Sequence, residues 1–84
     1  MYKIILEKKP ENFFRKLEKK EQERIAKKFS ELEKNPELGK PLTANLAGLW
    51  SLRFGDYRAI YAIKHNELVI LVLKLGHRKD IYGN

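Results

Sequence analysis

LWSLRFGDYRAIYAIKHNELVILVLKLGH, residues 49–77, is the stretch that decides the fold of this 84-residue chain. Aromatic and β-branched residues are typical of β-strands, and here they are concentrated in three runs, at 49–54, 57–64 and 67–75. The runs are separated by two short turns, Gly55-Asp56 and His65-Asn66. Because two-residue turns are typical of β-hairpins, the stretch predicts an antiparallel meander of three strands.

The first hairpin predicts a pair of arginines on one face of the sheet. If Phe54 pairs with Tyr57, then Arg53 lies directly opposite Arg58, where like charges normally destabilise a strand pair. A guanidinium group keeps its proton and offers donors in a fork that matches phosphate oxygens. The pair therefore indicates a phosphate site. The alternative is that both side chains simply extend into solvent or bind surface carboxylates.

The second hairpin predicts what else lies on that face. We expect Lys64 to pair with Glu67. Arg58 then faces Leu73, and His77 continues along the same face if the strand persists. The opposite face is predicted to form the core against helices, and it carries Trp50, Leu52, Phe54, Ala59, Tyr61, Ile63, Ile70 and Val72.

The N-terminal half is predicted to supply one more strand and the covering helices. Residues 1–7 alternate as a short strand, and Pro10 suits the first turn of a helix. From there to about Lys34 one apolar stripe follows helical spacing, with Phe14, Leu17, Ile25, Phe29 and Leu32. The residues leave open whether this region is one helix or two. With a loop at 34–48 the order is β-α(α)-β-β-β, an α+β fold in one domain, residues 1–84.

Composition limits the class of protein. A net charge of +7 favours a polyanionic partner, which would be nucleic acid or an anionic protein. Cysteine is absent, which excludes disulfides and thiolate metal sites. The longest apolar run, Leu68 to Leu73, is far shorter than the roughly 20 residues that span a bilayer. The apolar stretch of the N-terminus is too short for a secretory signal, so we expect a cytoplasmic protein with no membrane contact.

The segments resemble the RelE family of toxins from type II toxin–antitoxin systems over nearly the whole chain. Two motifs carry the resemblance, Gly-Asp-Tyr-Arg-x-Ile-Tyr at 55–61 and Gly-His-Arg-Lys-Asp-x-Tyr at 76–82. The fold implied is RelE-like, also called microbial-ribonuclease-like, with the order β-α-α-β-β-β. In that fold an N-terminal pair of antiparallel helices packs on one face of an antiparallel sheet. The resemblance puts the break between the helices near Glu18 to Glu21.

The activity implied is cleavage of mRNA in the ribosomal A site, without a metal or any other cofactor. The 2′-hydroxyl of the substrate attacks the adjacent phosphate and leaves a 2′,3′-cyclic phosphate. By resemblance, Arg58 stabilises transition-state charge, Arg53 helps to bind the phosphate, and Arg78 binds the scissile phosphate or the leaving side. Tyr82 stacks on a base or takes part in proton transfer, and His77 lies where several relatives carry a histidine.

Two departures from the family pattern bear on the chemistry. Where the family carries two alternating lysines on the strand before the hairpin, this chain has Ser51 and Arg53. Neither side chain is a good base, because an arginine stays protonated. The spacing from Arg78 to Tyr82 is also shorter than in well-known members. These departures make His77 the best candidate for proton transfer, a role that suits the usual titration range of histidine.

The resemblance also implies partners. A RelB-like antitoxin is expected, in a toxin–antitoxin hetero-oligomer, together with the ribosome and its A-site mRNA. For the antitoxin we expect exposed apolar residues on the arginine face, namely Ile60, Ala62, Val69 and Leu71. For RNA or the ribosome we expect the basic residues Lys16, Lys19, Lys20, Arg24, Lys27, Lys28 and Lys79. The helical members of this set would equally suit a solvated face with Glu–Lys pairs.

Two other functions stay open at this point. The related ParE-like branch shares the fold but inhibits DNA gyrase without nuclease activity, and it usually lacks the complete set of two arginines and a tyrosine. A catalytically weak member would act only by binding an antitoxin, and Ser51 keeps this reading open.

Overall fold

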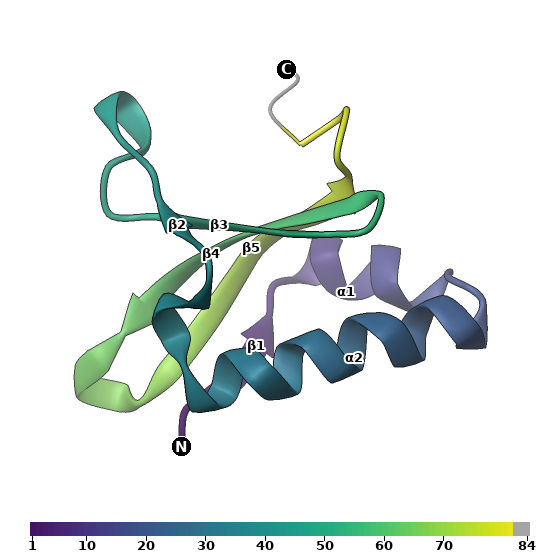
Figure 1. Cartoon of the computed structure of the whole chain (residues 1–84), viewed down its shortest axis with the longest axis horizontal. Helices are drawn as coiled ribbons and strands as arrows, with labels where there is room; N and C mark the ends of the chain where they lie inside the picture. Colours follow the sequence, from purple (N-terminus) through teal and green to yellow (C-terminus); the bar gives the residue numbers. More distant parts are fainter. Residues whose placement is uncertain (82–84) are drawn as a thin grey trace.

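The computed structural model describes residues 1–81 and consists of one sheet and two α-helices (Figure 1). The helices are α1 (Lys8–Arg15) and α2 (Lys19–Lys34). The strands are β1 (Lys3–Leu6), β2 (Lys40–Pro41), β3 (Trp50–Phe54), β4 (Tyr57–Lys64) and β5 (Val69–His77). Three short 3₁₀ turns complete the order, η1 (Pro36–Leu38), η2 (Ala44–Leu46) and η3 (His65–Glu67). None of the helices within residues 1–81 is long and apolar enough to cross a membrane.

The sheet has the strand order β1-β5-β4-β3-β2. The predicted antiparallel meander of β3, β4 and β5 is confirmed, and β2 adds to it antiparallel beside β3. β1 pairs parallel with β5, so the five-stranded sheet is mixed. A parallel neighbour needs a long connection, and the helices and the other three strands all lie between β1 and β5 in the chain.

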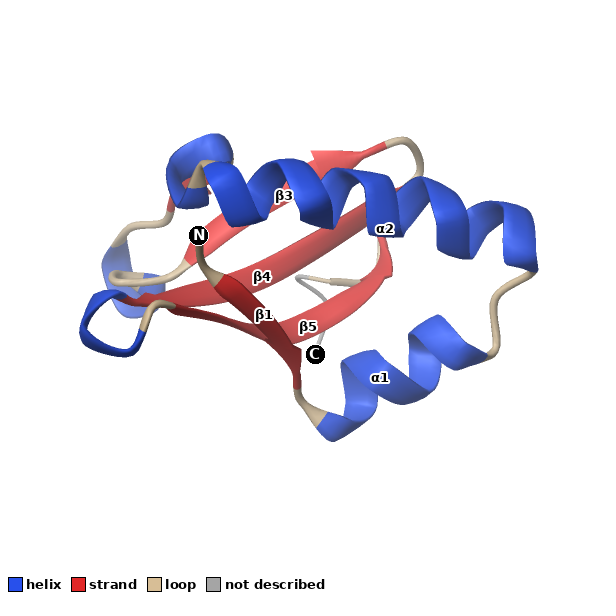
Figure 2. Ribbon diagram, turned by 90° about the horizontal axis from the view of Figure 1, so that it is seen from below, coloured by secondary structure: helices blue, strands red, loops and turns tan. Residues whose placement is uncertain are grey.

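Both helices cover the same face of the sheet, and α2 runs back in the opposite direction to α1 (Figure 2). The chain breaks between Arg15 and Lys19, at the start of the expected window. Gln22 holds this break, because its side-chain amide donates to the carbonyl oxygens of Phe14 at 2.9 Å and of Arg15 at 3.3 Å. Both carbonyls lie in the last turn of α1, where backbone acceptors have few partners within the helix, and that of Phe14 also accepts from the N–H of Leu17 at 3.2 Å.

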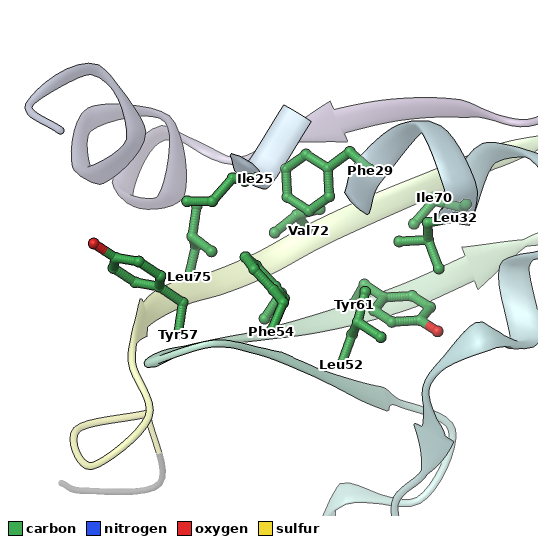
Figure 3. Close-up of a cluster of buried hydrophobic side chains, with 11 residues drawn as sticks. Ile25, Phe29, Leu32, Leu52, Phe54, Tyr57, Tyr61, Ile70, Val72 and Leu75 are labelled. Atoms are coloured by element: carbon green, nitrogen blue, oxygen red, sulfur yellow. The ribbon is translucent and has the colours of Figure 1, made fainter. Parts of the chain in front are cut away.

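The core lies between the helices and the face of the sheet predicted to be apolar (Figure 3). Tyr61, Ile70 and Val72 are fully buried there, against Ile25 and Leu32 of α2. Full burial of one such side chain stabilises the fold by about 1.5–3 kcal/mol. The predicted core face is therefore confirmed. The face that carries Arg53 and Arg58 lies on the side away from the helices.

The predicted register of the second hairpin is wrong. Lys64 pairs with Val69 instead of Glu67, because η3 and the left-handed Leu68 lengthen the turn. A β-bulge between Ile60 and Tyr61 then leaves one extra residue of β5 unpaired. A bulge of one residue exchanges the two faces of the strand beyond it. Beyond the bulge, residues of β5 therefore lie on the face opposite to the one predicted.

Candidate active site

Arg53 and Arg58 lie directly opposite each other on the sheet face that the helices leave uncovered, as predicted. Arg53 is exposed and Arg58 is half-buried. Arg58 donates from Nη1 to the Oγ of Ser51 at 2.5 Å, and Ser51 is itself buried. The hydroxyl thus fixes the direction of one guanidinium group, while the other extends into solvent.

A groove of about 330 Å³ runs beside this pair, at the edge of the sheet formed by β2 and β3. We call it the arginine groove, and its lining residues are Leu38, Gly39, Lys40, Ser51, Leu52, Arg53 and Arg58. Three of these residues are cations and none is a carboxylate. The groove is therefore suited to a phosphate group or another anion.

The wall of the groove is held by the buried phenol of Tyr61. Its hydroxyl donates to the carbonyl oxygen of Pro36 at 2.7 Å and accepts from the N–H of Gly39 at 3.1 Å. A Cβ atom at Gly39 would lie 2.4 Å from the carbonyl oxygen of Ser51, so only glycine fits there. Burial raises the pKa of Tyr61, although the N–H of Gly39 acts in the opposite direction.

A second hollow, of about 450 Å³, lies at the end of β5. We call it the C-terminal pocket, and it is lined by Asp56, His77, Arg78, Lys79 and Asp80. The backbone N–H of Arg78 donates to the carbonyl oxygen of Asp56 at 2.8 Å, which ties this pocket to the β3–β4 turn. No group of three or more acidic or histidine side chains within residues 1–81 is arranged to hold a metal ion.

Ile81 anchors the turn that carries Arg78. Its side chain is buried, and it lies so close to Gly76 that a Cβ atom there would be 3.1 Å from Cδ1 of Ile81. The turn therefore folds back over the uncovered face of the sheet, as Figure 1 shows near the C-terminus. Tyr82, which we expected to join the site, lies outside the described residues.

The prediction that His77 shares a face with Arg53 and Arg58 is wrong. Because of the bulge, Arg58 lies opposite Gly76, and His77 lies opposite Tyr57 on the helix side. The imidazole stacks on Tyr57 at a centroid distance of 5.2 Å and meets the edge of Phe13 of α1 at 5.8 Å. His77 is exposed all the same, and it lines the C-terminal pocket together with Arg78.

The electrostatic surroundings of Tyr57 keep its phenol neutral. Burial raises its pKa, and a hydrogen bond to Glu21 together with the negative charges of Glu21 and Asp56 acts in the same direction. Arg24 acts against them, but it also lies 3.7 Å from the carboxylate of Glu21. Beneath His77 there is thus an uncharged aromatic ring, which forms a flat support for the imidazole.

The basic residues expected to contact RNA lie on the surface of the helices and of the C-terminal turn. Lys28 is half-buried and its ammonium lies 3.5 Å from Glu31. The side chains of the remaining members are exposed, namely Lys16, Lys19, Lys20, Arg24, Lys27 and Lys79. A surface ion pair such as that of Lys28 with Glu31 contributes less than about 1 kcal/mol, so it holds the Lys28 side chain only loosely.

The apolar residues expected to bind an antitoxin lie on the uncovered face, but one of them is not exposed. Ile60 is buried under the η2 loop and Ile81, at a hollow of about 250 Å³. Ala62, Val69 and Leu71 are half-buried. Leu71 pairs with Ile5 of the edge strand β1, which is exposed and extends the apolar surface.

Two lysines of the uncovered face were not predicted from the sequence. Lys40 lies opposite Ser51 in the short strand β2, and Lys74 lies opposite Ile60. Lys74 reaches this face only because of the bulge, and Lys40 sits in a stretch that reads as loop. Neither position follows from the alternation of apolar residues along the strands.

The fold matches that of known toxins. The complex RelBE2 of Mycobacterium tuberculosis contains a chain that superposes with a TM-score of 0.82 at 29% identity, over 92% of this chain and 98% of that one. The archaeal RelE–RelB complex of Pyrococcus horikoshii gives a TM-score of 0.73 at 29% identity, over 94% and 97% of the two chains. The RelE-like fold implied by the motifs is therefore confirmed.

The sequence comparisons give the family. The model of the family described as ParE toxin of type II toxin–antitoxin system, parDE, matches residues 6–82. Toxin RelG of Mycobacterium tuberculosis is 42% identical over 55 residues, which cover 64% of this chain and 63% of that protein. The chain thus spans less than two thirds of this curated relative. It belongs to the ParE toxin family of type II toxin–antitoxin systems, within the RelE/ParE superfamily.

Proposed function

We propose that this toxin is an endoribonuclease that cleaves mRNA in the ribosomal A site without a metal ion, and so stops translation. The 2′-oxygen of one nucleotide bonds to the adjacent phosphorus, and the bond from phosphorus to the 5′-oxygen breaks. The 2′-hydroxyl gives its proton to a water molecule, and the leaving 5′-oxygen takes a proton from an acid of the protein. The products are a 2′,3′-cyclic phosphate and a free 5′-hydroxyl.

The observation that carries the proposal is the pairing of Arg53 with Arg58 on the uncovered face, with Arg58 directed by Ser51. Negative charge grows on the phosphate oxygens in the transition state, and fixed cations stabilise that charge best when they need no reorganisation. Arg58 meets this requirement because its guanidinium is held before substrate arrives. Arg53, which is exposed, is the second cation.

The C-terminal pocket supplies the leaving side of the reaction. Arg78 contacts the scissile phosphate or the leaving nucleotide there, and His77 donates the proton to the 5′-oxygen. The pocket that the two residues share supports this role, because it brings the imidazole beside the arginine proposed to contact the leaving side. Tyr82 keeps the role implied by the resemblance, stacking on a base or proton transfer.

Contact with the ribosome falls to the basic residues of the helices together with Lys79. Their exposure supports this role, since ribosomal RNA offers a dense array of phosphates and each Lys or Arg that neutralises one releases a counterion. The interaction would accordingly weaken steeply as salt is raised. We also place the toxin in the cytoplasm, because ribosomes translate the proposed mRNA substrate there.

A RelB-like antitoxin is the proposed inhibitor. The two similar structures above are a RelBE2 toxin–antitoxin complex and a RelE–RelB complex. The footprint we propose consists of Ala62, Val69 and Leu71, with Ile5 at its margin and Ile60 beneath it. A bound segment on this surface would lie beside the arginines and block the access of RNA.

The test is to map the ends of mRNA on programmed ribosomes after treatment with the toxin or with its Arg58→Ala variant. We expect cleavage within the A-site codon by the wild type and loss of that cleavage in the variant. A free 5′-hydroxyl on the downstream fragment accepts phosphate from a kinase without prior phosphatase treatment, which checks the chemistry.

The second candidate function is inhibition of DNA gyrase. It is favoured by the family description, which names ParE toxins. Intact mRNA together with gyrase-linked DNA breaks in treated cells would support this function over the nuclease.

A further inference from the structure

The short strand β2 brings a lysine to the candidate active site. β2 contains only Lys40 and Pro41, and they pair with Ser51 and Trp50 of β3. Proline cannot donate to a sheet ladder, so β2 is suited to the edge position that it occupies. Residues that pair directly across antiparallel strands share a face of the sheet. Lys40 therefore lies on the face that carries Arg53 and Arg58.

The position of Lys40 is fixed by its neighbours in the chain. Gly39 is bonded to the phenol of Tyr61, whose ring is fully buried in the core. On the other side, the N–H of Leu42 donates to the carbonyl oxygen of Leu49 at 2.8 Å and closes the loop that follows. The backbone on both sides of Lys40 is thus tied down, although its own side chain is exposed.

The charges around Lys40 indicate an anionic ligand. It lines the arginine groove with Arg53 and Arg58, and none of the lining residues within 1–81 carries a carboxylate. The guanidinium of Arg58 rests on Ser51, which is the residue that Lys40 faces. Two cations from different strands therefore flank one small serine residue on the same face of the sheet. A group with several anionic oxygens, such as a phosphodiester, can satisfy both of them at once.

We propose that Lys40 and Arg58 bind the same phosphate of the RNA, with Ser51 as the spacer that leaves room for both. This inference rests on the proposed nuclease function and adds a residue to it. Arg58 offers a planar fork of donors, whereas Lys40 supplies a compact charge on a flexible stem. Lys40 follows the phosphate as its geometry changes during the reaction, while Arg58 stays fixed by its serine.

The experiment measures single-turnover cleavage of A-site mRNA on programmed ribosomes. The main variant is Lys40→Gln, which keeps most of the stem and removes the charge. Lys40→Arg restores a cation at the same place. The matched control is Lys3→Gln, because Lys3 is also an exposed lysine but lies on β1, the opposite edge of the sheet. Thermal unfolding of each variant checks that the fold is intact.

We expect Lys40→Gln to slow cleavage roughly 10- to 100-fold, Lys40→Arg to recover most of the rate, and Lys3→Gln to match the wild type. In the Arg58→Ala background, Lys40→Gln should cost less than roughly 3-fold, because two cations on one phosphate act as a coupled pair. Such coupling would not arise from a purely structural role of Lys40.

Three results would overturn the inference. An unchanged rate in Lys40→Gln would do so while leaving the proposed function intact, provided that Arg58→Ala still slows cleavage by at least roughly 100-fold. Independent, multiplicative effects of the two substitutions would show that Lys40 and Arg58 do not share a phosphate. Intact mRNA with the wild type would remove the proposed function and this inference together.

Discussion

Arg58 faces Arg53 directly across the strand pair, but it donates a hydrogen bond to the hydroxyl of Ser51, which lies two residues before Arg53 in β3. The contact turns one member of a like-charged pair aside, so the two guanidinium groups need not point along parallel directions. The buried Ser51 thus orients Arg58, although it cannot itself serve as a cation or a base.

Ser51→Ala removes the oxygen that directs Arg58. We expect cleavage of A-site mRNA to fall roughly 10-fold, since a cation that must reorganise stabilises the transition state less well. The free energy of unfolding should fall by about 1.5–3 kcal/mol, the usual net contribution of a hydrogen bond to a charged group. Ser30→Ala, an exposed serine on α2, is the control. Equal activity of both variants would mean that Ser51 does not position Arg58.

His77→Gln tests the proton donor. Loss of general acid catalysis should lower the single-turnover rate by about 10²- to 10⁴-fold, with binding to the ribosome unchanged. The chain offers a matched control in His65, the other histidine, which accepts or donates a 2.7 Å hydrogen bond with the hydroxyl of Tyr2. His65→Gln should keep full activity. If His77→Gln cleaves as fast as the wild type, the imidazole is not the acid.

Tyr61→Phe tests the phenol that holds the groove wall. It leaves the Pro36 carbonyl and the Gly39 N–H without their partner. We expect a loss of about 1–3 kcal/mol in the free energy of unfolding. The midpoint of thermal unfolding should fall by about 4–8 °C for each kcal/mol in a domain of this size. Tyr2→Phe, at a half-buried phenol near the N-terminus, is the comparison, and equal losses in the two variants would contradict this account.

The same variant has a signature in alkaline solution. Burial raises the pKa of Tyr61 in the folded protein, so the unfolded chain loses the phenolic proton first as the pH rises. This contribution to stability is complete below about pH 10, the usual value for tyrosine, and is lost above it. The free energy of unfolding, measured with urea, should therefore fall more steeply above that pH in the wild type than in Tyr61→Phe. Parallel curves would contradict the assignment.

Leu71→Arg tests the antitoxin footprint. A charge in the centre of the apolar surface should weaken binding of a RelB-like antitoxin by about 2–4 kcal/mol, because the bound partner would bury it without a counter-ion. Ala26→Arg places the same charge on the helix side and should leave the affinity unchanged. Titration calorimetry with the antitoxin distinguishes the two. Undiminished affinity of Leu71→Arg would place the footprint elsewhere.

Much of the site was predictable because it depends on local sequence. Gly55 and Asp56 specify a tight hairpin, and a tight hairpin puts Arg53 opposite Arg58 whatever the rest of the chain does. The core face followed from the alternation of residues such as Leu52 and Phe54. The break between the helices was placed by resemblance, and the side chain of Gln22 now gives its physical cause.

The position of His77 could not be predicted in the same way. It depends on η3 and on a single extra residue in β5, and each arises from how three strands and their turns fit together. The alternation of apolar and polar residues along one strand does not predict a bulge in its pairing with the next strand. Lys40 escaped prediction for a related reason, since a two-residue strand is specified by the buried Tyr61 and not by its own sequence.

The most direct test of the central claim is the mapping of mRNA ends on programmed ribosomes with wild-type toxin and with Arg58→Ala. The account predicts a cut within the A-site codon that yields a 5′-hydroxyl end, and a loss of at least roughly 100-fold in rate when Arg58 is removed. An Arg58→Ala variant that cuts the same codon at the wild-type rate would contradict it, as would intact mRNA in the presence of the wild-type toxin.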